Sequence, residues 1–236
     1  ELKDQVGGFK VGLEFVRSTL ANLVTMAEEE ALKELERVRR LYKTLQGAYF
    51  DDAKLDDIPN TIEGAVRGIV PLKPWAFNVH ASAGLGAVKA AVAGKGESLV
   101  LGVTVLTSIG VTDGVDECVS IFGAEARVKV PQFVDLLLQA GADGVICSAK
   151  DLEHLQHRRH RPLLKVTPAI RPKWAAAGDQ KRITTPTDAI KLGATHLVVG
   201  RPITKPPTEV GSRVRAAQLV VEEIQAALAA VAQKGG

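Results

Sequence analysis

Short, continuous runs of apolar residues alternate with helical patterns along the whole chain, and this alternation limits the folds open to it. Continuous apolar runs are typical of strands that are buried on both faces, as in a parallel sheet covered by helices. Two architectures fit such repeated units, a (β/α)8 barrel and an open doubly wound sheet. The chain has no glycine-rich GxGxxG segment that opens a helix after an early strand, and this disfavours a dinucleotide-binding open sheet.

The apolar runs predict seven strands. They are Phe9–Leu13, Ala48–Asp52, Ala76–His80, Leu99–Leu106, Gly144–Ser148, Leu163–Pro168 and His196–Val199. A (β/α)8 barrel needs one more, so we expect a TIM-type barrel whose first strand is missing from this sequence or precedes it. No linker rich in proline, glycine or serine divides the chain, and we therefore expect residues 1–236 to form one barrel domain.

Two helices stand out by their spacing of apolar residues. Within Glu28–Leu45, leucine and valine recur at steps of three and four, with opposite charges such as Glu29 and Lys33 beside them. We expect the apolar positions, which include Leu32 and Leu35, to form one buried stripe. A second apolar stripe, from Ala216 to Val231, predicts a C-terminal helix.

Composition excludes several classes of function. Of the 236 residues, 46% are hydrophobic, which is enough for a full core, and the net charge of +3 comes without a basic block. We therefore expect no nucleic-acid partner. The two cysteines, Cys118 and Cys147, fit no metal-ligand spacing, and no metal site is expected. The most apolar stretch, residues 98–111, is too short to cross a membrane, so we expect a cytoplasmic protein with no membrane contact.

Charged residues are concentrated at the end of the second predicted strand. Residues 52–57 read Asp-Ala-Lys-Leu-Asp-Asp, and residues 58–61 read Ile-Pro-Asn-Thr. Because alternate residues of a strand point to the same face, Asp52 and Lys54 are expected to project side by side. Barrel enzymes carry their active sites at this end of the strands. A solvated acidic loop with an incidental lysine is the alternative interpretation.

The pattern Asp-x-Lys-x-x-Asp followed by Ile-Pro-Asn-Thr resembles the active-site motif of the orotidine 5′-phosphate decarboxylase family. Further segments resemble this family in the same order along the chain: FKVG at 9–12, VLTS at 105–108, VTPAIR at 166–171 with GDQKR at 178–182, and VGRPI at 199–203. The resemblance extends from about Lys10 to Thr204. It implies a TIM-barrel carboxy-lyase of pyrimidine biosynthesis that converts orotidine 5′-phosphate to uridine 5′-phosphate without metal or cofactor.

The resemblance also implies a role for each matching residue. Lys54 protonates C6 of the pyrimidine after carbon dioxide leaves, Asp52 lies against the substrate carboxylate, and Lys10 holds Asp52 and the ribose. Asp57 and Thr61 reach the active site of the neighbouring subunit in a homodimer with shared sites. The implied contacts to the nucleotide substrate come from Thr107 and Ser108 at the pyrimidine and from Arg171, Gln180, Gly200 and Arg201 at the 5′-phosphate.

Elementary electrostatics favours the same chemistry at Lys54. Decarboxylation leaves a vinyl carbanion that no cofactor delocalises, and an ammonium group beside that carbon both stabilises the charge and supplies a proton. At an effective dielectric constant of ~20, unit charges ~4 Å apart interact by about 4 kcal/mol. Such an energy corresponds to roughly three powers of ten in rate.

Three alternatives remain open. A sugar-phosphate decarboxylase or aldolase of the same superfamily shares the Asp-x-Lys-x-x-Asp part of the motif. Loss of the first strand would give a non-catalytic barrel that binds a phosphorylated ligand, and the chain could also be one domain of a fused pyrimidine-synthesis protein.

The chain departs from the family pattern at three points. Nothing before Lys10 supplies the family's ribose-binding aspartate, and Ala169 stands where a glycine is usual. The stretch from Lys10 to Asp52 is longer than in bacterial relatives. We expect the charged helix Glu28–Arg40 to take up this extra length outside the barrel.

Overall fold

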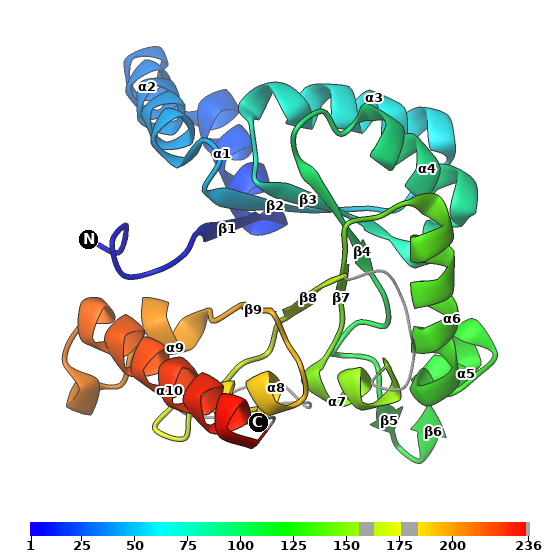
Figure 1. Cartoon of the computed structure of the whole chain (residues 1–236). Coiled ribbons are helices and arrows are strands. Elements are labelled where there is room, and N and C mark those ends of the chain that lie inside the picture. The colour runs from blue at the N-terminus through cyan, green and yellow to red at the C-terminus, as the bar shows by residue number, and fades with distance from the viewer. Residues whose placement is uncertain (156–162, 176–183, 235–236) are drawn as a thin grey trace.

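A computed structural model describes residues 1–155, 163–175 and 184–234, and its main feature is a parallel sheet that curls into a barrel (Figure 1). The strands are hydrogen-bonded in the order β1-β2-β3-β4-β7-β8-β9. They are β1 (Phe9–Gly12), β2 (Tyr49–Leu55), β3 (Ala76–His80), β4 (Leu99–Val103), β7 (Gly144–Ile146), β8 (Leu164–Thr167) and β9 (His196–Leu197). All seven predicted strands are present, several of them shorter than predicted.

The helices surround the curled sheet (Figure 1). They are α1 (Leu13–Thr25), α2 (Glu28–Leu45), α3 (Pro59–Ile69), α4 (Leu85–Gly94), α5 (Glu117–Phe122), α6 (Ala126–Ala140), α7 (Ala149–Leu152), α8 (Pro186–Lys191), α9 (Arg201–Thr204) and α10 (Arg213–Lys234). A small antiparallel hairpin, β5 (Val111–Thr112) and β6 (Val115–Asp116), precedes α5. Within the described ranges, no helix is long and apolar enough to cross a membrane.

The main core lies between the sheet and helices α3, α4 and α6. Its residues come from apolar strand positions such as Phe77 and Val100 and from helix positions such as Val66 and Leu137, all of them fully buried. Strand β4 carries Gly102 where α6 comes closest, because a Cβ atom there would lie 2.1 Å from Leu137 Cδ2. The absence of a side chain at this position allows the helix to pack directly on the sheet.

The curled sheet has two edges, β1 and β9, and no hydrogen bond joins them in the described part of the chain. A mainly apolar groove of about 450 Å³ separates them. Its walls include Phe9 of β1, Leu197 of β9, and Val220 and Ile224 of α10. The fold is therefore a (β/α)8-type barrel in which the position of one strand is open, in agreement with the prediction from seven strand segments.

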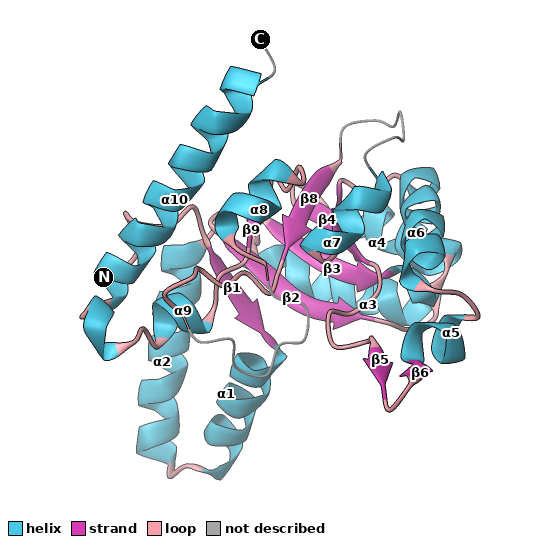
Figure 2. Cartoon of the chain, turned by 90° about the horizontal axis from the view of Figure 1, so that it is seen from below, coloured by secondary structure: helices cyan, strands magenta, loops and turns pink. Residues whose placement is uncertain are grey.

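The predicted helix Glu28–Leu45 is present with the same bounds, but its burial differs from the prediction. Only Leu45 is buried, whereas Leu32 and Leu35 are exposed. The reason is that α2 packs mainly on α1, and the two helices extend away from the barrel as a hairpin (Figure 2). This position agrees with the prediction that the helix Glu28–Arg40 takes up the extra length of the chain outside the barrel.

Candidate active site

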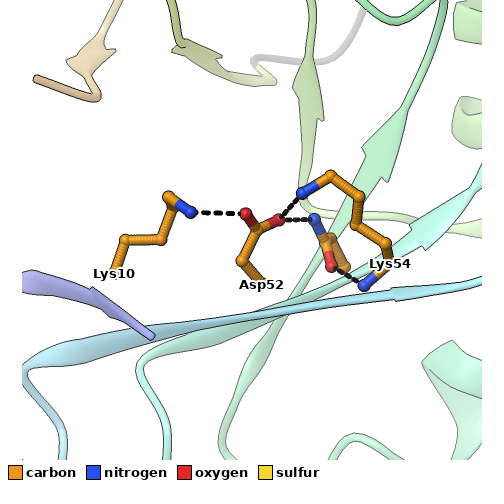
Figure 3. Close-up of polar contacts among 4 residues, drawn as sticks. Lys10, Asp52 and Lys54 are labelled. Atoms are coloured by element: carbon orange, nitrogen blue, oxygen red, sulfur yellow. Dashed lines mark hydrogen bonds and ion pairs between the residues drawn. The ribbon is translucent and has the colours of Figure 1, made fainter. Parts of the chain in front are cut away.

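Asp52 is the centre of a charged cluster on the first two strands (Figure 3). Lys10 Nζ donates a hydrogen bond to Asp52 Oδ2 at 2.6 Å, and Lys54 Nζ donates to Oδ1 at 2.5 Å. The carboxylate side chain is only 7% exposed, whereas those of Lys10 and Lys54 are 38% and 35% exposed. A buried anion thus holds two ammonium groups that are open to a ligand.

The register of the strands brings these side chains together. In the β1–β2 ladder, Lys10 pairs with Phe50 and Gly12 pairs with Asp52, so Lys10 lies one strand away from Asp52. Asp52 and Lys54 are on the same side of the sheet, as strand alternation predicts, but β2 is not regular between them. The pairing of β2 with β3 shifts between Asp51 and Leu55, and Lys54 has a φ of +49°.

Asn78 of β3 stabilises this irregular backbone, and our sequence reasoning did not identify it. Its Nδ2 atom donates to Asp52 Oδ1 at 2.6 Å, and its Oδ1 atom accepts from the Lys54 backbone N–H at 2.6 Å. Asn78 is fully buried, and a left-handed φ at a residue such as Lys54 costs roughly 1–3 kcal/mol. The signal for Asn78 was an amide side chain inside the otherwise apolar run Ala76–Val79.

The two lysines determine the charge of Asp52. Burial alone would raise the pKa of this carboxyl group, but hydrogen bonds and positive charge from Lys10 and Lys54 outweigh it and lower the pKa below its usual value. Asp52 is therefore an anion at neutral pH.

The neighbouring Asp51 is in a different environment. It is also buried, with 6% of its surface exposed, and strand alternation directs it to the other face of β2. Burial, and then the negative charge of Asp52, raise the pKa of Asp51 to about 6. Two adjacent aspartates of one strand therefore titrate in opposite directions from the ordinary value.

The charged cluster faces a cavity of about 360 Å³ at the carboxyl ends of the strands. The predicted site residues that line it are Lys10, Asp52, Lys54, Thr107, Arg171, Gly200 and Arg201. An apolar wall is formed by Val103, Val105, Ile146 and Ile170, among others. Among the described residues, no group of three or more His, Cys, Asp or Glu side chains is placed to hold a metal ion.

The arginine side of the cavity is formed by the segments that follow β8 and β9. Arg171 is buried there, and Arg201 follows Gly200 at the start of α9. Guanidinium groups bind phosphate oxygens with two parallel hydrogen bonds, and barrels of this class commonly bind phosphate after their last strands. Ala169 has a φ of +65°, which a glycine adopts without strain, so the departure from the family pattern lies at a demanding position of this loop.

Three of the predicted site residues that the structure describes do not line the cavity. Ser108 is exposed and outside the lining, so the segment 107–108 contributes only its threonine. Asp57 and Thr61 are exposed near the start of α3, where Asp57 Oδ1 accepts a hydrogen bond from the Ile58 backbone at 2.7 Å. Gln180 lies outside the described residues.

Comparison with known proteins gives a consistent result. The family described as orotidine 5′-phosphate decarboxylase / HUMPS matches residues 1–216. The orotidine 5′-phosphate decarboxylase of Staphylococcus haemolyticus is 45% identical over 167 residues, which are 69% of this chain and 72% of the relative. That of Moorella thermoacetica is 34% identical over 233 residues, 95% of this chain and 84% of the relative.

Solved structures agree with the fold. The crystal structure of orotidine 5′-phosphate decarboxylase from Lactobacillus acidophilus superposes with a TM-score of 0.65 at 28% identity, covering 91% of this chain and 85% of the other. The enzyme from Pyrococcus horikoshii, at 21% identity and a TM-score of 0.62, covers 95% of this chain and 89% of the other. The second likeness supports the fold alone.

The raised pKa of Asp51 predicts a pH-dependent stability. A carboxyl group with a higher pKa in the folded protein binds more protons when folded, so its contribution to stability falls as the pH rises from about 4 to about 6. The variant Asp51→Asn should therefore be more stable than the native protein above pH 7, by about 2 kcal/mol, and similar to it near pH 4. Urea unfolding at a series of pH values measures this difference.

The exposed Asp4→Asn is the matched control, and it should leave the profile unchanged. If Asp51→Asn followed the native profile at every pH, Asp51 would not be a protonated, buried carboxyl group in the folded protein.

Proposed function

The chain belongs to the orotidine 5′-phosphate decarboxylase / HUMPS family, and we propose that it decarboxylates orotidine 5′-phosphate to uridine 5′-phosphate. The observation that carries this proposal is the array of Lys10, Asp52 and Lys54 at one side of a cavity with two arginines at another. The reaction needs a fixed cation at the reacting carbon and an anchor for the phosphate. Both are available in this cavity.

In the proposed reaction, the bond between C6 and the carboxylate carbon breaks, the carboxylate leaves as carbon dioxide, and the electron pair of the bond remains on C6. The ammonium group of Lys54 then donates a proton to C6, which forms the C–H bond of the product, and the resulting amine regains a proton from solvent. Because Asp52 holds the ammonium group before substrate binds, little reorganisation is needed when the negative charge develops. Lys10 fixes the other oxygen of Asp52 and contacts the ribose.

We assign the 5′-phosphate to Arg171, Gly200, Arg201 and Gln180. Thr107 and Ser108 belong to the segment that approaches the pyrimidine. Binding energy from the remote phosphate can then be used to hold C6 against Lys54. The apolar wall of the cavity suits the face of a flat ring, and this favours a pyrimidine over the open, hydroxylated sugar phosphate of the alternative enzymes.

The proposal includes an assembly. Asp57 and Thr61 are exposed beside the cavity rather than in it, and we assign them to the active site of a neighbouring subunit in a homodimer. Residues 1–236 act as one catalytic barrel domain in the cytoplasm, with no metal, cofactor, nucleic acid or membrane in the reaction.

The test is the loss of orotate ultraviolet absorbance when the protein meets orotidine 5′-phosphate in chelator-treated buffer. The native protein should turn the substrate over, and Lys54→Ala should reduce turnover by about a thousandfold or more while remaining folded. The exposed Lys89→Ala is the matched control and should have native activity. Substantial activity in Lys54→Ala would exclude the proton-donor role, and a flat trace from folded native protein would exclude the function.

Shared active sites predict complementation between two inactive variants. Lys54→Ala and Asp57→Asn should each be inactive, but a heterodimer contains one site with both native residues. After unfolding and refolding as an equimolar mixture, the sample should recover about a quarter of the native activity per subunit. A mixture that stayed as inactive as its components would indicate that Asp57 acts within its own subunit or has no role.

A further inference from the structure

The hairpin formed by α1 and α2 exposes an unusual number of large apolar side chains. On α1 these are Leu13, Val16, Leu20 and Val24, and on α2 they are Leu32 and Leu35, with exposed fractions from 40% for Val16 to 75% for Val24. The hairpin extends away from the barrel, so the described part of the chain does not cover this surface (Figure 2). An apolar surface of this kind usually marks an interaction site.

These side chains lie on one face of the hairpin. On α1, Val16, Leu20 and Val24 each directly follow a buried or half-buried residue, and on α2 Leu32 and Leu35 also follow half-buried residues. One step along a right-handed helix turns the side chain by about 100°. In two antiparallel helices, this rotation directs both sets of side chains to the same side of the hairpin.

The charges on α2 are arranged so that a second copy of the same helix fits this surface. Positions 28, 32, 35 and 39 form one stripe with Glu28 at one end, Leu32 and Leu35 in the middle and Arg39 at the other end. In a second, antiparallel copy related by an axis through the midpoint between the two leucines, Arg39 would lie opposite Glu28 of the first copy and Leu35 opposite Leu32. The same pairs form with the two copies exchanged. The stripe is therefore complementary to itself under a two-fold axis.

The ion pairs of the helix support this interpretation. Glu29 pairs with Lys33 and Glu34 pairs with Arg37, each at 2.6 Å, within α2 itself. Glu28 and Arg39 form no ion pair with any residue of the described ranges, although both are exposed. The two end charges of the stripe thus remain available for a second copy.

The same axis also suits α1. A turn at Met26 and Ala27 joins the two helices. The number of residues from Leu20 to this turn is nearly the same as the number from the turn to the midpoint between Leu32 and Leu35, so both positions lie at the same level of the hairpin. An axis through this level places Leu20 against its own copy and Val16 against Val24. One two-fold axis therefore pairs the apolar residues of both α1 and α2 with those of the second copy.

We propose that two copies of this chain associate through their α1–α2 hairpins, with the apolar faces packed together as an antiparallel four-helix bundle. The pairs of Glu28 with Arg39 fix the register at its two ends. The two barrels then lie at opposite ends of the bundle, and this contact is separate from the shared active-site contact proposed above.

The test is a charge exchange at the ends of the stripe. Glu28→Arg and Arg39→Glu each place like charges opposite one another, and each should lower the native mass measured by light scattering at micromolar concentration to that of a dimer. In an equimolar mixture, the two arginines of the Glu28→Arg chain lie opposite the two glutamates of the Arg39→Glu chain. These opposite charges attract, and the native mass should return. Glu30→Arg, on the opposite side of α2, is the matched control and should keep the native mass.

Native mass in both single variants would overturn the proposal, as would a mixture that failed to regain it. The turnover of orotidine 5′-phosphate per subunit should be the same in Glu28→Arg as in the native protein. A loss of turnover together with mass would show that the hairpin contact is part of the active-site interface, contrary to the separation proposed here.

Discussion

The cost of burying the carboxylate of Asp52 is the constraint on which the site depends. An isolated buried charge is strongly unfavourable, so Asp52 requires partners that the fold holds in place. They come from three adjacent strands: Lys10 from β1, Lys54 from β2 and Asn78 from β3. The register of these strands is therefore a condition for the charged cluster, and the cluster in turn favours that register.

The same constraint prepares the two lysines for the role that we propose for them. The lysines keep Asp52 ionised, and Asp52 keeps the ammonium groups at fixed positions on the wall of the cavity. An ammonium group already in place stabilises a developing carbanion without the reorganisation that water would require. The left-handed backbone at Lys54 is the structural strain that accompanies this placement, and Asn78 offsets it with a hydrogen bond.

Continuous apolar runs were sufficient to predict the strands, because parallel strands are buried on both faces. Strand alternation predicted that Asp52 and Lys54 share a face, whereas the grouping of Lys10 with Asp52 came from the resemblance to the family. The sequence was insufficient where tertiary context decides. The bulge in β2 depends on its neighbour β3, so Asn78 could not be assigned a role from strand alternation alone. Leu32 and Leu35 have the spacing of a buried stripe. Periodicity alone does not show whether such a stripe packs against the barrel or is exposed on the chain's surface, as it is here. Ser108 follows Thr107 in the motif, yet only the threonine reaches the cavity.

We propose that Asp52 acts by fixing the two ammonium groups, and the single-turnover rate of orotidine 5′-phosphate decarboxylation by Asp52→Asn tests this role. Asparagine keeps the shape of the side chain but removes the charge that holds Lys10 and Lys54. We expect a rate at least about a hundredfold below that of the native protein for fully bound substrate, with a native circular dichroism spectrum that shows the fold is preserved. A rate close to that of the native protein would contradict this role.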